Sequence, residues 1–276
     1  MKELALVVGV LGLACAMARG EPTDEIPVAR FETPPAIDGR LDDDAWALTQ
    51  RHHLRNVRKG ELKNATSARV GYDNANLYVA FRCEEAQMQH LVTVWNHAEE
   101  RDSAIWQDDC VEVFLDPLAR STETGAHIVV NSAGVWYDAW NADRGWDCEI
   151  RTAVTKEPKA WTIEIAIPFS AIGLQPKGGE TWLINLGREQ KSSNELSCLG
   201  NGSGAFGNPE RYVPVIFTGG GPVRVLSLAD ADKHAVRVRL NNPTQDAVEY
   251  RAVVRSMRGT AKISDRAETV RVSGAG

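Results

Sequence analysis

The chain has 276 residues, of which 43% are hydrophobic, and a formal net charge of −6 at pH 7. This length and hydrophobic content are sufficient for one large domain or two ordinary domains with packed cores. Basic and acidic residues are interspersed without a Lys/Arg stripe. The charge pattern therefore argues against a nucleic acid partner, which would require a phosphate-neutralising surface.

The N-terminal residues predict export. Lys2 precedes an apolar run at residues 4–14, and residues 16–18 (Ala-Met-Ala) match the small-x-small pattern of a signal-peptidase site. We expect residues 1–18 to be a signal peptide and the mature protein to be secreted or periplasmic, with a lipoprotein attached through Cys15 as the less favoured alternative. No stretch reaches the roughly 20 apolar residues of a transmembrane helix, so no membrane span is expected.

Four cysteines follow the predicted cleavage site: Cys83, Cys110, Cys148 and Cys198. An even number in an oxidising compartment permits up to two disulfides, in connectivities among which the sequence does not choose. Because no two of these cysteines have C-x-x-C spacing, a zinc site is the weaker interpretation.

Residues 31–218 are predicted to form an all-β domain, an antiparallel, jelly-roll-like β-sandwich. Short runs of apolar residues are separated by Gly, Asn, Asp and Pro. In residues 161–167 the apolar side chains recur at every second position, which is typical of a strand with one buried face. The predicted strands span residues 68–70, 77–83, 111–115, 127–131, 149–154, 161–167, 182–188 and 212–217.

Helical signals between these strands are short. Residues 45–48, capped by Asp42, and residues 168–172 before Gly173 each predict a single helical turn. Residues 84–109 show no clean period and predict a long irregular loop. Long loops on a rigid sandwich often carry function.

The sequence changes character after a predicted domain boundary at residues 218–222 (Thr-Gly-Gly-Gly-Pro). Residues 236–240 alternate cleanly, residues 241–246 predict a turn, and residues 248–254 begin another strand. An immunoglobulin-like sandwich takes about seven strands and about 100 residues. We therefore expect residues 222–276 to be an incomplete second β-rich region.

Four ordered sequence blocks resemble those of family 9 carbohydrate-binding modules, which are DOMON-like β-sandwiches. The blocks are residues 37–46 (Ile-Asp-Gly-Arg-Leu-Asp, then Trp46), residues 72–80, residues 106–116 and residues 161–172. The resemblance implies a non-catalytic module that holds a sugar between two aromatic faces while polar side chains bond its hydroxyls. It also implies polysaccharide or oligosaccharide as the ligand and a glycoside hydrolase as a partner in carbohydrate catabolism.

The same resemblance assigns the site residues. Trp106 takes the position of the first binding Trp, Glu112 that of the acidic hydroxyl-binding residue, and Asn131 that of a polar residue lining the cleft. Phe206 stands where the family has its second binding Trp, and Val129 stands where a basic residue is usual. Phe in place of Trp reduces the stacking area, and Val in place of a basic residue removes a hydrogen-bond donor for sugar hydroxyls.

The side chains around Trp106 favour this site on physical grounds as well. An indole face can bury the C–H patches of a pyranose, at about 25 cal/mol per Å², while carboxylates accept hydrogen bonds from its hydroxyls. Trp106 lies close in sequence to Glu112 and Asp108. The apolar residues of the strand at 111–115 alternate, so Glu112 is predicted to point away from the core.

Other Trp and Asp residues have two interpretations each. Trp140 can extend a binding platform, although a core or rim position is the favoured interpretation, and Trp46 and Trp182 are predicted to lie in the core. For the carbohydrate-binding interpretation, calcium is the cofactor that the sequence suggests. Residues 42–44 (Asp-Asp-Asp) could bind it through their oxygens, or they could cap a helical turn.

Two further functions remain as alternatives. A glycoside hydrolase would draw its carboxyls from Asp108, Asp109, Glu112 and Asp116, but hydrolysis needs two carboxyls about 5 to 9.5 Å apart on opposite sides of the bond. These four lie on one predicted strand and its lead-in, so they cannot flank a substrate unaided. A haem-binding DOMON-type electron-transfer domain would use Met88 and His127 as ligands.

Overall fold

The structure, a computed structural model, describes residues 2–9, 25–58, 60–200, 206–218, 223–229, 235–240, 248–258 and 261–272. The chain divides into two compact units. One is Thr23–Thr218, which we call the main domain, and the other combines Met1–Pro22 with Gly219–Gly276.

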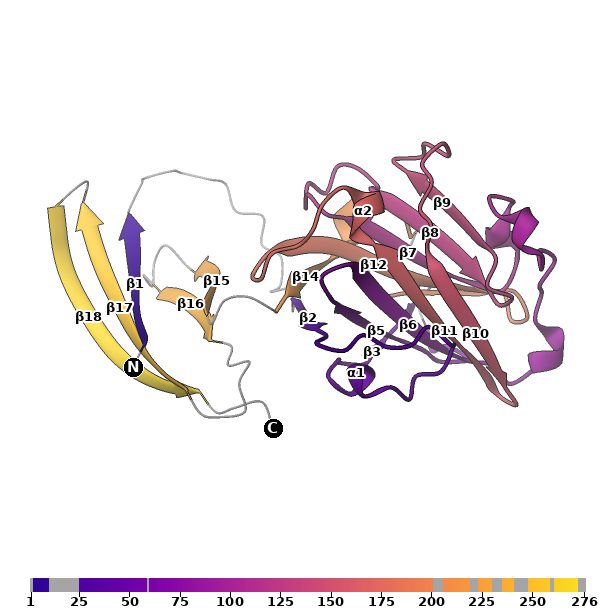
Figure 1. Ribbon diagram of the computed structural model, residues 1–276, viewed down its shortest axis with the longest axis horizontal. Helices are drawn as coiled ribbons and strands as arrows, with labels where there is room; N and C mark the ends of the chain where they lie inside the picture. The colour runs from indigo at the N-terminus through magenta and orange to yellow at the C-terminus, as the bar shows by residue number, and fades with distance from the viewer. Residues whose placement is uncertain are drawn as a thin grey trace. The chain divides into compact units, whose positions relative to one another are not determined.

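Ten strands form the body of the main domain: β2 (Ile26–Arg30), β5 (Thr66–Tyr72), β6 (Asn76–Glu84), β7 (Cys110–Asp116), β8 (Ala126–Asn131), β9 (Trp136–Trp140), β10 (Arg151–Glu157), β11 (Ala160–Pro168), β12 (Thr181–Gln190) and β14 (Val213–Phe217). They pair in the order β10-β11-β6-β5-β2-β14-β12-β7-β8-β9. In Figure 1, β5, β6, β11 and β10 make one layer and β12, β7, β8 and β9 make the other. Each predicted strand overlaps one of these ten, so the all-β sandwich is confirmed.

The sheet is mixed because of β2, which the sequence did not predict. β2 runs parallel to β14 on one side and parallel to β5 on the other, and so joins the two layers. The remaining described pairings of the main domain are antiparallel. The antiparallel pairing expected from the sequence therefore has one described exception in the main domain, the strand β2.

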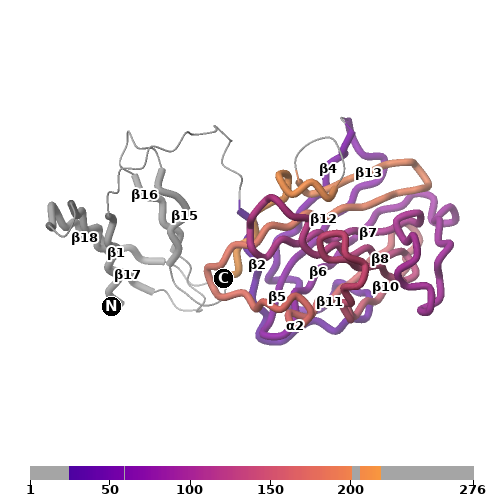
Figure 2. The backbone as a smooth tube through the Cα atoms, turned by 90° about the horizontal axis from the view of Figure 1, so that it is seen from above, coloured from indigo at the N-terminus to yellow at the C-terminus, as the bar shows by residue number. Residues whose placement is uncertain are grey.

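Three short strands complete the sheet. β3 (His52–His53) pairs with β5, and β13 (Glu195–Cys198) pairs with both β12 and β4 (Arg55–Asn56). Figure 2 shows β4 and β13 side by side along the edge of the domain next to β12.

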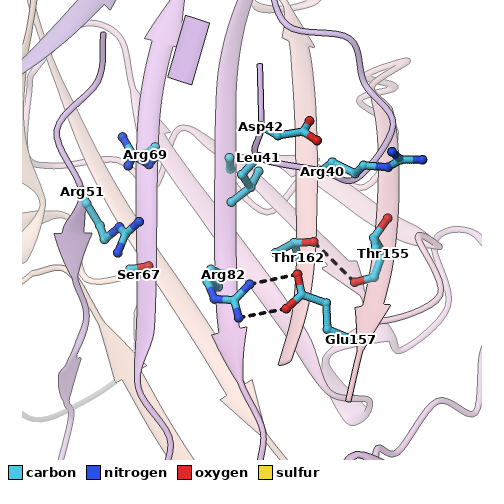
Figure 3. Close-up of a pocket in the computed structure, with 11 residues that line it drawn as sticks. Arg40, Leu41, Asp42, Arg51, Ser67, Arg69, Arg82, Thr155, Glu157 and Thr162 are labelled. Carbon is cyan, nitrogen blue, oxygen red and sulfur yellow. Dashed lines mark hydrogen bonds and ion pairs between the residues drawn. The ribbon is translucent and has the colours of Figure 1, made fainter. Parts of the chain in front are cut away.

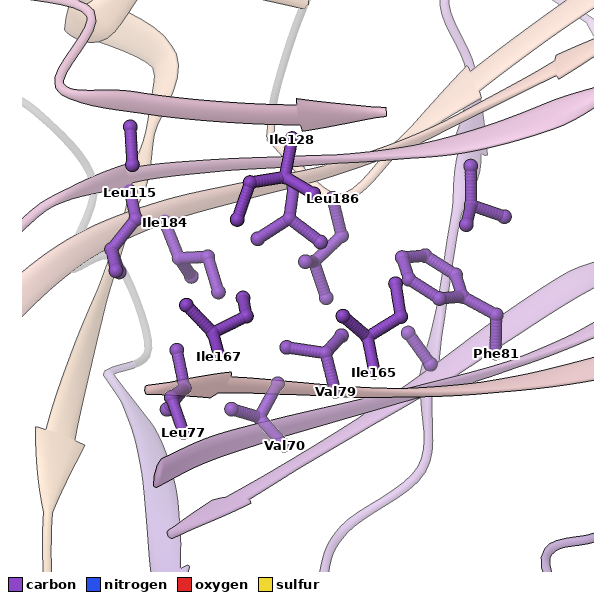
Figure 4. Packing of buried hydrophobic residues seen from close by; sticks show 14 of the residues in the cluster. Val70, Leu77, Val79, Phe81, Leu115, Ile128, Ile165, Ile167, Ile184 and Leu186 are labelled. Carbon is purple, nitrogen blue, oxygen red and sulfur yellow. The ribbon is translucent and has the colours of Figure 1, made fainter. Parts of the chain in front are cut away.

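The main core lies between the two layers. Ile163, Ile165 and Ile167 of β11 are at most 1% exposed, as their alternation predicts. Ile165 and Ile167 face Ile128 of β8 and Ile184 of β12 across the interior (Figure 4). Each such side chain contributes roughly 1.5–3 kcal/mol when fully buried, so this interlayer packing is the main source of the domain's stability.

A second apolar cluster covers the outer face of the β5-β6-β11 layer. Trp46 of the helical turn α1 (Asp44–Ala47) packs there against Phe31, Tyr78 and Ala166. Trp46 and Trp182 are 1% and 0% exposed, which confirms both as core residues. The N-cap of α1 is Asp43 rather than Asp42.

The second predicted helical turn and the long irregular loop are also confirmed. The turn is α2 (Phe169–Ile172), which Gly173 ends in the left-handed conformation at φ 73°. Between β6 and β7 the chain forms three single 3-10 turns, η1 (Met88–His90), η2 (Ala98–Glu100) and η3 (Ile105–Gln107). A fourth, η4 (Pro209–Arg211), precedes β14.

The second unit contains two small sheets. β1 (Lys2–Gly9), β17 (Val248–Arg258) and β18 (Ala261–Val272) form one, and β15 (Val223–Ala229) and β16 (Ala235–Leu240) form the other. β16 and β17 confirm the two strands predicted there. Residues 219–222 of the predicted boundary, residues 241–246 of the predicted turn and residues 10–18 of the predicted signal peptide lie outside the described residues. The domain bounds and the signal peptide stay predictions.

The cysteines form none of the disulfides that the sequence permits. Cys83, Cys110, Cys148 and Cys198 are all free and buried. Burial raises the pKa of both Cys83 and Cys148 to about 12, so these thiols stay protonated and unreactive at neutral pH. None of the helices in the described part of the chain has the length and apolar character of a membrane-spanning segment.

Candidate saccharide-binding site

A cavity of about 550 Å³ opens on the β12-β7-β8-β9 layer, on the face turned away from the main core. Strand alternation creates this face. Val111 and Val113 of β7 enter the core, so Glu112 and Phe114 point to the other side, as predicted for Glu112. The cavity is lined by Glu112, Phe114, Thr124, His127, Tyr137, Ala139, Ala142, Glu189, Leu196, Phe206 and Gly207.

Aromatic rings form much of the cavity wall. His127 of β8 stacks on Phe114 of β7, its cross-strand partner, with ring centroids 4.1 Å apart and planes 12° apart. Tyr137 of β9 meets the His127 ring edge-on at 5.6 Å. Such contacts fix the rings in orientation, which leaves a preformed apolar surface for a ligand.

Phe206, the predicted second aromatic face, lines this cavity and rests on Gly187 of β12. A Cβ atom at Gly187 would lie 2.7 Å from the Phe206 ring, so this strand position has room for the ring only because it carries no side chain. The Phe206 carbonyl accepts a hydrogen bond from Asn185 Nδ2 at 2.8 Å.

Two carboxyl groups lie together on the same face. Glu112 Oε2 is 2.7 Å from His127 Nε2, and Glu112 pairs with Gly187 across β7 and β12, two residues from Glu189. Burial raises the pKa of Glu189, and the nearby Glu112 carboxyl raises it further, against the opposing effect of the ion pair with Lys191. These acceptors are placed to receive ligand hydroxyl groups.

Trp106, the predicted first aromatic face, is half-buried beside the cavity rather than among its lining residues. Its indole meets Tyr137 edge-on at 5.2 Å. The exposed guanidinium of Arg144 lies 5.6 Å from the Trp106 ring and 5.5 Å from the Tyr137 ring. Trp106 therefore supports Tyr137 and remains accessible to solvent at the rim.

Asp108 and Asn131, also predicted for the site, are fully buried and do not line the cavity. Asn131 Nδ2 donates to Asp108 Oδ2 at 2.8 Å, and the two Asp108 oxygens accept from the backbone amides of Val94 and Trp95. Together they fasten the irregular loop to β8. The polar atoms of these two side chains form hydrogen bonds with other groups of the protein.

Trp140, the last predicted site residue, lies on the opposite face of β9 from Tyr137. It pairs across the strands with Ala126 of the main core, packs against that core and contacts Trp146 at 5.5 Å. The structure therefore places it in the core-side position that the sequence favoured over the binding platform.

Of the lining residues, the sequence interpretation assigned Glu112 and Phe206 to the site and missed the others, among them Phe114, His127, Tyr137 and Glu189. Phe114 and His127 carry the same alternation signal as Glu112, since each occupies a non-core position of a predicted strand. Tyr137 and Glu189 meet them only through the pairing of β8 with β9 and of β7 with β12.

The hydrolase alternative depended on carboxyls that the structure does not bring together. Asp109 and Asp116 are buried and accept hydrogen bonds from backbone amides, those of Val92 and Leu118 among them, whereas Glu112 faces the cavity. Glu189 supplies a second carboxyl, but it shares one sheet face with Glu112. Of the four carboxyls that the sequence proposed for hydrolysis, Glu112 alone is among the described lining residues of this cavity.

The two ligands proposed for haem are also separate. Met88 packs against the main core, whereas His127 faces the cavity on the other side of the β7-β8 layer. Asp43 Oδ2 accepts the Ala36 amide at 3.2 Å. Within the described residues, no group of three or more His, Cys, Asp or Glu side chains is placed to hold a metal ion.

Comparison with solved structures shows where this fold occurs. A family 9 carbohydrate-binding module from Caldicellulosiruptor kristjanssonii in complex with cellotriose is 18% identical, with a TM-score of 0.57 over 77% of this chain and 100% of that chain. The glucose complex of such a module from the same organism gives the same identity and TM-score, over 72% and 97%. A putative carbohydrate-binding protein from Bacteroides uniformis is 16% identical, with a TM-score of 0.53 over 70% and 98%.

These identities show the fold alone, and no curated protein matches the chain. The family model described as "Carbohydrate family 9 binding domain-like" matches residues 37–188. This match covers more than half of the chain and includes Trp106, Glu112 and all four of the sequence blocks that resemble the family. The chain belongs to the carbohydrate family 9 binding domain-like family.

Proposed function

We propose that the main domain binds a saccharide in the cavity around Glu112 and does not cleave it. The observation that carries this proposal is the pairing of chemistries in one preformed cavity, where the rings of Phe114, Tyr137 and Phe206 adjoin the carboxyls of Glu112 and Glu189. A sugar ring has the matching surfaces, with apolar C–H patches on its faces and hydroxyls at its edge.

Each part of the cavity has a role in this proposal. Phe206 and Tyr137 offer apolar surface to the ring faces, and Trp106 extends that surface at the rim. Glu112, held by His127, and Glu189 accept hydrogen bonds from hydroxyls. Arg144 lies over Trp106 and Tyr137, where its guanidinium supplies the donor that Val129 does not.

The biological setting of this site is part of the same proposal. The N-terminal sequence favours a secreted or periplasmic protein, and the family resemblance favours an accessory of a glycoside hydrolase that degrades polysaccharide. Related modules have been solved with cellotriose and with glucose, so β-glucan fragments are the first ligands to test.

The test is calorimetric titration of the full chain with glucose, cellotriose and a panel of plant and algal oligosaccharides. Glu112→Gln keeps the shape of the side chain and removes the charge. Since hydrogen bonds to charged groups contribute about 1.5–3 kcal/mol, we expect binding to weaken by about 10-fold or more. Glu61→Gln, an exposed residue that does not line the cavity, is the matched control and should bind as the wild type does.

Two results would contradict the proposal. Wild-type protein that binds no member of the panel would reject saccharide binding, and equal affinity in Glu112→Gln and wild type would reject this cavity as its place. Release of reducing ends from the same panel by the purified chain would instead favour the hydrolase alternative.

A further inference from the structure

A second cavity, of about 470 Å³, lies on the outer face of the other layer. Its floor is formed by residues of β5, β6, β11 and β10, and residues 40–42 form a wall above them (Figure 3). Four arginines line it: Arg40, Arg51, Arg69 and Arg82. We call it the arginine cavity. A volume of this size is typical of sites for small-molecule ligands.

In the part of the chain that the structure describes, the ion pairs of the arginine cavity involve Arg82 and Arg40 and not Arg51 or Arg69. Arg82 forms ion pairs with Glu157 and Glu84, each at 2.9 Å. The guanidinium of Arg40 approaches Asp38 only at 4.0 Å, with both side chains exposed, so this pair is weak. Asp42 is the other acidic residue in the lining.

Arg51 and Arg69 are the uncompensated pair. Arg69 Nη1 donates to the carbonyls of Trp46 and Thr49 at 2.7 and 2.6 Å, which are neutral acceptors that fix the guanidinium in place. Among the residues that the structure describes, no carboxylate or other acceptor bonds the Arg51 side chain, and Figure 3 shows it beside Ser67 and Arg69 on the same side of the cavity. Partial burial lowers the pKa of Arg69 first, and the charge of Arg51 lowers it further. An anion bound between the two would remove this repulsion.

The remaining lining residues suit a hydroxylated ligand. Thr162 donates its hydroxyl proton to the Gly39 carbonyl at 2.6 Å, so its oxygen is left as an acceptor. Ser67 supplies a further hydroxyl group, and Leu41 and Ala80 add apolar surface. A bare inorganic ion would use the arginines but not these groups.

We propose that the arginine cavity binds the charged unit of an acidic saccharide, a sugar that carries a carboxylate or a sulfate ester. Arg51 and Arg69 bond the anionic group, and the Ser67 and Thr162 hydroxyls bond the neighbouring hydroxyls of the sugar. This site lies on a different layer from the cavity around Glu112. The domain therefore has one site for a neutral sugar face and another for an acidic unit.

The experiment titrates the full chain with oligogalacturonate, with a sulfated galactose oligosaccharide, with neutral cellotriose and with sodium sulfate. We expect one or both acidic oligosaccharides to bind at low ionic strength and to weaken as salt is added. Arg51→Gln should weaken this binding by about 10-fold or more, because a charge-assisted hydrogen bond to the anion is lost. Arg58→Gln removes the same charge from an exposed residue outside the lining and should have no such effect.

The controls separate this proposal from the first one. Glu112→Gln should leave acidic-saccharide binding unchanged, and Arg51→Gln should leave neutral-saccharide binding unchanged. The proposal is overturned if neither acidic oligosaccharide binds, if Arg51→Gln and Arg58→Gln bind equally well, or if sulfate alone binds as tightly as the oligosaccharides. The last outcome would indicate a site for simple anions.

Discussion

Trp106 and Trp140 are both half-buried, yet the faces on which they lie give them different roles. Trp106 supports Tyr137 at the cavity rim, whereas Trp140 packs against the main core behind the same strand. Tyr137 and Trp140 are three residues apart on β9, and an odd separation along a strand places side chains on opposite faces. The direction of each side chain therefore decides whether it contributes to binding or to stability.

Alanine substitution of these two residues tests this distinction. For Trp106→Ala we expect a loss of saccharide affinity of about five-fold or more, because Tyr137 loses its edge contact and the rim loses apolar surface. For Trp140→Ala we expect unchanged affinity and a loss of up to about 3 kcal/mol in the free energy of unfolding, since a half-buried Trp contributes less than a fully buried one. Calorimetry and denaturant unfolding of both variants provide the measurements, and the reverse pattern would contradict the assignment.

Asp108 and Asn131 show that a sequence motif can place a residue near the site without revealing whether its side chain contacts a ligand. Both belong to the sequence pattern that resembles the family. Asp108 precedes β7 and Asn131 ends β8, and both of these strands contribute side chains to the cavity lining. Their hydrogen bonds nevertheless connect the irregular loop to β8. Whether a polar side chain faces a ligand or a backbone amide depends on the path of the loop, which the sequence pattern does not determine.

The strand β12 shapes the cavity because Gly187, in this strand, has no side chain. Gly187 pairs with Glu112 across the sheet and provides the space in which the Phe206 ring lies. The segment that carries Phe206 comes from beyond β13, so a ring distant in sequence completes a wall built from β7, β8 and β9. The glycine thus determines the distance between Phe206 and the carboxyls.

Gly187→Ala should displace Phe206. The added Cβ would lie 2.7 Å from the ring, so the ring must move. We expect a loss of about 1–3 kcal/mol in stability, the usual cost of overpacking, and saccharide affinity at least about 5-fold weaker. Combining Gly187→Ala with Phe206→Leu should recover part of the stability but not the affinity, because the smaller side chain relieves the clash and removes the stacking surface. Additive stability losses in the double variant would show that the two residues do not interact.

Residues 37–46, which lie over the outer face of the β5-β6-β11 layer, are attached to β11 by the Glu164 carboxyl and by the Thr162 hydroxyl. Glu164 is fully buried and accepts hydrogen bonds from the Trp46 indole at 2.7 Å and from the backbone amides of Gly39 and Asp38 at 2.8 and 3.0 Å. This anchor holds both the second apolar cluster and the wall of the arginine cavity in place. Burial raises the pKa of Glu164, against the lowering effect of these three donors.

This pKa shift gives stability a defined dependence on pH. The pKa of Glu164 is higher in the folded than in the unfolded chain. At pH values between these two pKa values, the folded state therefore binds more protons than the unfolded state. The contribution of this group to stability therefore falls as pH rises above the unfolded value of about 4.3. The advantage of wild type over Glu164→Gln in denaturant unfolding should be largest near about pH 4 and should decrease toward about pH 7. A difference that grows with pH would contradict the assignment.

For the whole molecule, alternation and turn chemistry predicted the two layers, but not how they are joined. Residues 161–167 show the period of a half-buried strand, and the structure confirms the strand as β11 but buries both of its faces, because the residues around Trp46 cover the outer one. β2 carries no such signal, since Pro27 interrupts a short segment of five residues. Its assignment depends on parallel partners at residues 71–72 and 215–217, far away in the sequence. Long-range pairing of this kind leaves no local pattern, and the same reason kept Tyr137 and Glu189 out of the predicted site.

The last prediction concerns the independence of the main domain. The described core residues between the layers and all described lining residues of both cavities belong to Thr23–Thr218. A domain with its own core is expected to fold alone. A fragment of residues 23–218 should therefore unfold in one cooperative transition and bind both saccharide classes with the Kd values of the full chain. Circular dichroism melting and calorimetry on the fragment are the measurements. A fragment that unfolds cooperatively but fails to bind one of the two saccharide classes would contradict this prediction. Its fold would be intact, so the cavity for that saccharide would depend on residues outside the main domain.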